Sequence, residues 1–146
     1  MNVVEILAKK GSDVVTVRPD DTIGSVVDAL ADRRFGALVV SADGVAIDGI
    51  ISERDIVRGL STVTLGLRDM EVSTLMTAPV RTCAGADSIG DLMERMTEHR
   101  IRHLPVEEDG ALVGMISIGD VVKWRVNELE EEARHLEGYI SGAGYA

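Results

Sequence analysis

Two short segments of the chain place a serine and an aspartate three residues apart, where a strand is expected to run into a helix. The first has the sequence GIISERD at 49–55, and the second has the sequence GMISIGD at 114–120. At a helix N-terminus, free backbone N–H groups and the helix dipole favour an anion. A serine hydroxyl there can bind phosphate, and an aspartate one turn later on the same face suits ribose hydroxyls. The segments therefore predict two sites for a sugar phosphate.

The same residue types also have a purely structural interpretation. Ser52 and Ser117 can act as N-caps, and Asp55 and Asp120 can complement the helix dipole as first-turn acids. One segment alone does not separate the two interpretations, whereas the recurrence of the whole pattern favours binding.

The two segments belong to an internal repeat. A shift of 66 residues superposes nine identical pairs between Thr16 and Gly44, and a shift of 65 superposes five more between Gly49 and Val57. The change of shift falls at 45–48, in an expected turn, where one residue can be lost. These 14 identities indicate that the chain consists of two copies of one structural unit.

Each copy predicts the element order β-α-β-β-α. Short β-branched runs at 14–17 and 80–82 precede helix starts at Thr22 and Ser88, and apolar residues then recur every three or four positions. Two strands follow in each copy, joined by the Asp-Gly dipeptides at 43–44 and 109–110, which are typical of hairpins. Apolar residues of the second helix are expected to face inward, namely Ile56, Val57 and Leu60 in the first copy and Val121, Val122 and Val126 in the second.

One such unit has too little apolar surface to close a core of its own, so pairing of the two units through their sheets is expected. The predicted fold class is α+β, with two β-α-β-β-α repeats packed sheet to sheet in pseudo-two-fold symmetry. Repeat 1 with the N-terminal segment is placed at 1–66, and the linker with repeat 2 at 67–126. A C-terminal helical extension with a tail of small residues is placed at 127–146.

Composition narrows the class of protein. A formal net charge of −10 and a pI near 4.7 oppose binding to the phosphate backbone of nucleic acid. The single cysteine, Cys83, cannot form an intramolecular disulfide, and it is expected to be a small buried hydrophobic residue. No segment approaches the roughly 20 apolar residues of a membrane helix. We therefore expect a cytoplasmic protein that binds neither nucleic acid nor membrane.

The pattern Gly-hydrophobic-Ile-Ser-x-x-Asp after a hairpin, present twice, resembles the cystathionine-β-synthase (CBS) domain family, in which a tandem pair forms a Bateman module. The resemblance covers 14–126, and the sequence MTEHRIRHLPV at 96–106 is similar to the second unit of small stand-alone bacterial CBS-pair proteins. It implies a homodimeric, non-catalytic regulatory or sensing module that binds AMP, ATP or NAD(H) between its units. Such a module acts by ligand-dependent conformational change on a regulated protein, here unknown.

The resemblance also implies two composite clefts, each built from the Ser-x-x-Asp helix of one unit and a wall of the other. The first cleft would comprise Ile50, Ser52, Arg54 and Asp55, closed by Val80, Arg81, Arg102 and His103. The second would comprise Met115, Ser117, Gly119 and Asp120, closed by Val14, Val15, Phe35, Gly36 and Ala37. The aspartates would accept from ribose, the serines would meet phosphate, and Ile50, Met115, Val80 and Val15 would enclose adenine.

The two clefts are not expected to be equivalent. Cationic side chains surround the first cleft. Gly119 and Gly36 occupy the matching positions of the second cleft, so it has few positive charges to bind phosphate, that is, little cationic help. We expect the first cleft to hold phosphate more strongly, and the second to accept a longer or less charged ligand.

Two other functions stay open at this stage. A nucleotide-processing enzyme would need a positioned general base and usually a metal, and only Asp55 and Asp120, already assigned to ribose, are candidates. A purely structural pairing module would leave both clefts unoccupied.

Four further residues have weaker interpretations. His99 and His103 have the four-residue spacing of helical metal ligands, but no third ligand is evident, so no metal site is predicted. Trp124 and Leu129 are candidates for a contact with a second copy, where an aromatic anchor is useful.

Overall fold

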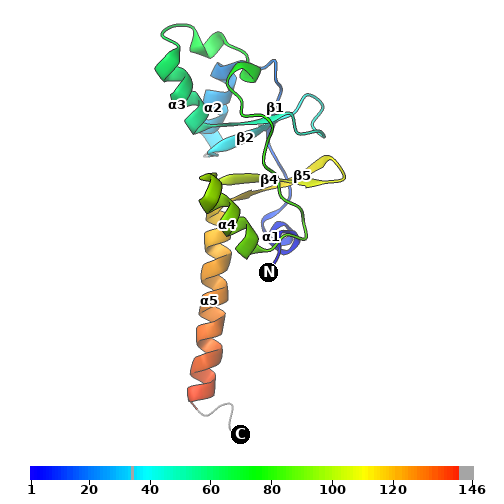
Figure 1. Ribbon diagram of the computed structural model, residues 1–146, viewed down its shortest axis with the longest axis vertical. Coiled ribbons are helices and arrows are strands. Elements are labelled where there is room, and N and C mark those ends of the chain that lie inside the picture. Colours follow the sequence, from blue (N-terminus) through cyan, green and yellow to red (C-terminus); the bar gives the residue numbers. More distant parts are fainter. Residues whose placement is uncertain (34, 142–146) are drawn as a thin grey trace.

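The computed structural model describes residues 1–33 and 35–141, which form two lobes and one long helix (Figure 1). The first lobe contains β1 (Thr16–Val17), α2 (Ile23–Arg33), β2 (Ala37–Val40), β3 (Gly49–Ser52) and α3 (Glu53–Thr62). The second contains α4 (Ile89–His99), β4 (His103–Glu108), β5 (Ala111–Ser117) and α5 (Ile118–Ile140). An N-terminal helix α1 (Val3–Lys10) and two 3-10 turns, η1 (Leu67–Asp69) and η2 (Val72–Thr74), complete the chain. The predicted α+β class is confirmed.

The sheets have the predicted hairpins but shorter first strands. In the first lobe β1 runs parallel to β2, which is antiparallel to β3, whereas the second sheet consists of β4 and β5 alone. The run at 80–82 is not a strand, because pairing starts only at Cys83, which forms a parallel bridge with Val106. The equivalent run at 14–17 is a strand only over Thr16–Val17.

The two Asp-Gly turns differ in kind. Asp109 and Gly110 both have positive φ, 51° and 79°, as a two-residue hairpin turn requires. The first Asp-Gly pair lies instead in a longer loop, where the carboxylate of Asp43 accepts from the backbone N–H groups of Val45 and Ala46 at 2.8 and 2.9 Å. These hydrogen bonds lower the pKa of Asp43. The prediction of a tight hairpin is therefore correct only for the second repeat.

The hydrophobic core of each lobe includes residues from a segment outside its own repeat. Val3 and Ile6 of α1 have no exposed surface and belong to the core of the second lobe. Leu67 and Val72, from the segment between the repeats, belong to the core of the first lobe. Each lobe thus takes an additional apolar element from outside its own repeat.

The sheets face each other across the seam between the lobes (Figure 1). Strand β2 is buried along its whole length, yet its alternate residues Ala37 and Val39 belong to the core of neither lobe. Because successive strand residues point to opposite faces, these two side chains face the second lobe, as the buried Pro105 of β4 faces the first. The register pairs Ala37 with Ser52 and His103 with Ser117, in keeping with the predicted pseudo-two-fold relation.

The second helix of each repeat is more exposed than predicted, although its extent in the second repeat agrees with the prediction. The predicted extension of the last helix is confirmed, since α5 is continuous from Ile118 to Ile140. Residues 142–146 of the predicted tail lie outside the described part of the chain. Of the residues expected to face inward, Val121 is buried and Ile56 is half-buried, whereas four are exposed: Val57, Leu60, Val122 and Val126. Trp124 packs in the core of its own lobe, with Lys9 Nζ 4.5 Å from its ring centroid, so it does not offer the expected dimer contact.

The packing of α1 can be tested with two adjacent valines. Val3 has no exposed surface, whereas Val4 is 56% exposed. Val3→Ala should lower the free energy of unfolding by about 2 kcal/mol, because two buried methyl groups are lost at about 0.8 kcal/mol each and a cavity remains. Val4→Ala is the matched control and should change it by less than about 0.5 kcal/mol. Chemical denaturation measures both values, and equal effects would contradict the docking of α1 described above.

Candidate functional site

The two Ser-x-x-Asp segments form reciprocal capping boxes at the starts of α3 and α5. Ser52 N–H donates to Asp55 Oδ2 at 2.9 Å, and Asp55 N–H donates to Ser52 Oγ at 3.4 Å. At α5 the equivalent distances are 2.9 Å from Ser117 N to Asp120 Oδ2 and 3.2 Å from Asp120 N to Ser117 Oγ. The structural interpretation of these residues is thus correct. It also means that both side chains have a defined orientation at a helix N-terminus.

Asp55 has further partners. Its Oδ2 also accepts from Ser52 Oγ at 3.1 Å, and its Oδ1 accepts from Thr77 Oγ1 at 3.1 Å. The side chain is buried within this network. A carboxylate offers about four acceptor positions. Three are occupied here, so Asp55 can accept one more hydrogen bond without losing its cap.

A cavity of about 290 Å³ lies beside this helix start, between the two lobes. Six residues predicted for the first cleft line it: Ile50, Ser52, Arg54, Asp55, Arg102 and His103. Val80 and Arg81 do not line it. The reason is that Thr77 pairs with Ile50 through two backbone hydrogen bonds of 3.0 and 2.8 Å, so residue 77, and not 80, lies beside β3.

The same cavity has a cationic wall that the sequence only partly indicated. Four guanidinium groups line it, two from α3 and two from the segment between α4 and β4: Arg54, Arg58, Arg100 and Arg102. None of them forms an ion pair with a carboxylate among the described residues. Arg58 lies one turn after Arg54, a spacing that could have identified it. In a chain of net charge −10, this gathering of unpaired cations creates a local site for an anion.

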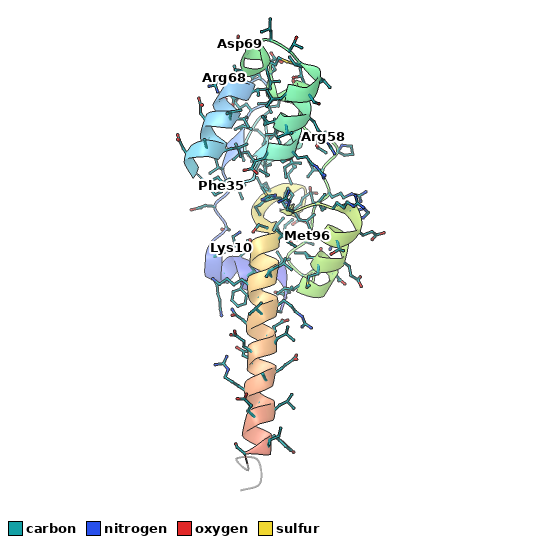
Figure 2. All side chains as sticks on the ribbon, turned by 90° about the vertical axis from the view of Figure 1, so that its left-hand side faces the viewer. Lys10, Phe35, Arg58, Arg68, Asp69 and Met96 are labelled. Carbon is teal, nitrogen blue, oxygen red and sulfur yellow. The ribbon has the colours of Figure 1, made fainter. Side chains whose placement is uncertain are left out.

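A second cavity, of about 460 Å³, lies on the other side of the seam. Seven residues predicted for the second cleft line it: Met115, Ser117, Val14, Val15, Phe35, Gly36 and Ala37. Gly119 and Asp120 are not among its lining residues. Figure 2 shows Phe35 at the level between the lobes and Lys10 at the end of α1.

Lys10 changes the interpretation of the second cavity. It lines the cavity, and its Nζ donates to Asp120 Oδ2 at 2.6 Å and to the backbone oxygen of Met115 at 2.9 Å. The expectation of little cationic help at this cleft is therefore wrong. Helix α1, which positions Lys10, was missed, although its capping box of Asn2 and Glu5 is a recognisable sequence signal.

The electrostatics of Asp120 follow from this contact. Burial alone would raise the pKa of Asp120, but the hydrogen bond from Lys10 and that from Ser117 N–H, with the charge of Lys10, lower it below the ordinary value. Asp120 is thus a carboxylate with a paired cation, whereas Asp55 is a carboxylate held by neutral donors.

His103 separates the two cavities and lines both, as do Gly36 and Ala37. A Cβ added to Gly36 would lie 3.0 Å from His103 Cε1, so a larger residue here would require the imidazole ring of His103 to shift. Burial lowers the pKa of His103, and the charge of Arg102 lowers it further. The common wall therefore carries a neutral imidazole at pH 7.

Other reactive groups carry less information. Cys83 is buried as predicted, and burial raises the pKa of its thiol to about 12. Within residues 1–33 and 35–141, no three His, Cys, Asp or Glu side chains gather as a metal site. Across those residues, no helix combines the length and apolar character needed to span a bilayer.

Comparisons with known proteins agree with the fold described above. The CBS domain family model matches residues 3–62 and 72–127. The CBS domain-containing protein CBSX3, mitochondrial, of Arabidopsis thaliana is 38% identical over 86% of this chain and 63% of its own length. The solved CBS-domain containing protein from Agrobacterium tumefaciens is 46% identical, with a TM-score of 0.81 over 85% of this chain and 92% of that one. A CBS domain protein from Pyrobaculum aerophilum, complexed with AMP, is 29% identical, with a TM-score of 0.70 over 82% and 89%. This chain thus spans less than two thirds of the plant relative but most of both solved chains.

The contact between Lys10 and Asp120 predicts a pH dependence. Because the pKa of Asp120 is lowered in the folded protein, its contribution to stability is present above the unfolded pKa of about 3.9 and is lost as the pH falls through the folded pKa. Lys10→Ala should raise the pKa of Asp120 in a carboxyl NMR titration and reduce stability mainly above about pH 4. Lys9→Ala removes the same charge from a position over Trp124 and is the control. An unchanged pKa in Lys10→Ala would refute the contact.

Proposed function

The chain belongs to the CBS-domain family, and on that premise we propose that it is a non-catalytic regulatory module that binds an adenine nucleotide between its repeats. The observation that carries this proposal is the first cavity. There a capped helix N-terminus, an apolar strand residue and four unpaired guanidinium groups face one space. These are the chemical requirements of a nucleoside phosphate: cations for phosphate, a carboxylate for ribose and an apolar surface for the base.

We assign the roles in the first cavity from its geometry. Phosphate would lie against the N-terminus of α3, within reach of the guanidinium groups, and Ser52 would donate to it only by turning its one hydroxyl proton away from Asp55. The remaining acceptor position of Asp55 would take a ribose hydroxyl, and Ile50 would contact the base. We take AMP as the ligand to test first, since a relative of this fold from Pyrobaculum aerophilum is complexed with AMP.

The second cavity would bind a nucleotide less readily. Asp120 does not line it and already accepts from Lys10, so a ribose hydroxyl could reach this carboxylate only by displacing that cation. Its volume of about 460 Å³ lies within the usual range of ligand pockets, roughly 300–1,000 Å³. A larger ligand such as ATP or NAD(H) remains part of the proposal for this side, with Val15 and Met115 against the base.

The state of the two carboxylates also argues against the rival function of a nucleotide-processing enzyme. Asp55 accepts three hydrogen bonds, and Asp120 is paired with Lys10. Neither is placed as a general base or a metal ligand. A purely structural pairing module would leave four like charges gathered around an empty cavity, an arrangement that an anion would stabilise.

As a regulatory module, the protein would signal through differential binding: the nucleotide stabilises one arrangement of the lobes, and another protein responds to it. We place the protein in the cytoplasm on the basis of its composition. The name of the plant relative contains the word mitochondrial, which describes that protein. The exposed apolar residues of α3 and α5 support association with a second copy.

Arg102 and Arg81 provide a matched test of nucleotide binding. Both are exposed arginines, but only Arg102 lines the first cavity. Arg102→Ala should weaken AMP binding about tenfold or more in isothermal titration calorimetry, because a hydrogen bond to a charged group contributes about 1.5–3 kcal/mol. Arg81→Ala should stay within about twofold of the unchanged protein. Equal losses in the two variants would contradict the assigned cavity, and no binding of AMP, ATP or NADH would contradict the proposed function.

Sensing and catalysis are distinguished by following the ligand itself. Incubation with ATP, AMP or NADH, with and without Mg²⁺, should raise the melting temperature and leave the nucleotide unchanged in mass spectrometry. A ligand that binds only the folded state raises the melting temperature without any reaction. Steady release of a product at substoichiometric protein concentration would overturn the non-catalytic assignment.

A further inference from the structure

Helix α5 extends well past the lobe in which it begins. Its buried residues are Val121 and Trp124, and beyond them the helix continues to Ile140. Figure 1 shows this part projecting away from both lobes. At 1.5 Å per residue, the 16 residues from 125 to 140 extend roughly 24 Å. This part of the helix gains little from packing against the lobes, so a partner along its length would stabilise it.

An exposed apolar stripe runs along this helix with the spacing of a coiled coil. The intervals are four, three, four, three and four residues, which is the heptad pattern of alternating d and a positions. The stripe consists of Val122, Val126, Leu129, Ala133, Leu136 and Ile140. Its large members are 51%, 45%, 47%, 64% and 82% exposed, in chain order. The spacing and the exposure together indicate an unpartnered coiled-coil face.

We propose that this face binds α5 of a second copy of the chain in a parallel, two-stranded coiled coil. In the heptad register, Val126 and Ile140 occupy a positions, and Leu129 and Leu136 occupy d positions. A β-branched residue at a with leucine at d is the combination that favours a parallel dimer. The stripe is therefore complementary to a copy of itself, and we define it as the α5 stripe.

The charges beside the α5 stripe are mixed, so they limit the affinity of the pair and make its orientation testable. In a parallel pair, each g residue faces the e residue five positions later in the other helix. Arg125 would thus face Glu130 of the second copy, an attractive pair. Glu132 would face Glu137 of the second copy, a repulsive pair. In an antiparallel pair, Glu137 would instead lie near Lys123 of the second copy.

The arrangement would connect the proposed nucleotide site to the dimer. Ser117 and Asp120 form the cap of α5 beside the second cavity, and the stripe begins two residues later, at Val122. One uninterrupted helix therefore extends from the cavity to the contact between copies. The dimer itself does not depend on nucleotide binding, so the two proposals can fail separately.

The charge pattern gives a sharp test on the full chain. Glu137→Lys turns both repulsive pairs of a parallel dimer into attractive ones, and sedimentation equilibrium should show a dimer tighter by on the order of tenfold at low salt. Glu131→Lys makes the same charge change at an outward f position and should stay within about twofold. High salt should reduce the difference. A weaker dimer in Glu137→Lys would overturn the parallel arrangement.

Disulfide cross-linking between two copies tests the same contact independently. In a Cys83→Ala background, Ala133→Cys places a thiol at an a position, where parallel helices bring identical residues together. Oxidation should then join two chains by a disulfide, whereas Glu131→Cys at position f should not. In antiparallel packing, residue 133 would face Leu129 of the second copy and no link would form. Absence of the link together with an unchanged dimer in Glu137→Lys would refute the α5 stripe as an interface.

Discussion

The fold and the site both depend on one constraint, the reciprocal capping of a helix by the strand that leads into it. Ser52 and Asp55 satisfy each other's backbone N–H groups, and Ser117 and Asp120 do the same. The cap sets where the strand ends, and it places a hydroxyl and a carboxylate at a helix N-terminus. Capping and binding are thus not alternatives here, because a carboxylate has more acceptor positions than a cap uses.

The two capping boxes differ in the residue outside the box that donates a hydrogen bond to the carboxylate. Asp55 accepts from Thr77, a neutral donor of the segment between the lobes, whereas Asp120 accepts from Lys10, a cation of the N-terminal helix. The free guanidinium groups gather at the first copy. A repeat that is symmetric in backbone therefore becomes asymmetric in charge, through residues that lie outside the repeated segments or differ within them.

Patterns within each repeat predicted most of the fold. The two strands that flank each Asp-Gly pair and both capped helix starts followed from local spacing. What failed depends on contacts between distant segments. The pairing of Thr77 with Ile50, which displaces Val80 and Arg81 from the cavity, leaves no local signal. The exposure of Val57 and Val122 also cannot follow from periodicity, because an apolar helix face looks the same whether it meets its own core or another chain.

The distribution of the arginines suggests how a bound anion would act on the lobes. Arg54 and Arg58 belong to the first lobe, and Arg100 and Arg102 to the second. Without an anion, repulsion between these like charges would oppose close approach of α3 and the segment before β4, although solvent weakens it because all four side chains are exposed. On the proposed function, a phosphate between them would replace this repulsion by attraction to both sides. The capping box already holds Ser52 and Asp55 in place, so binding would change mainly the relation between lobes, and that relation is where a regulatory signal can arise.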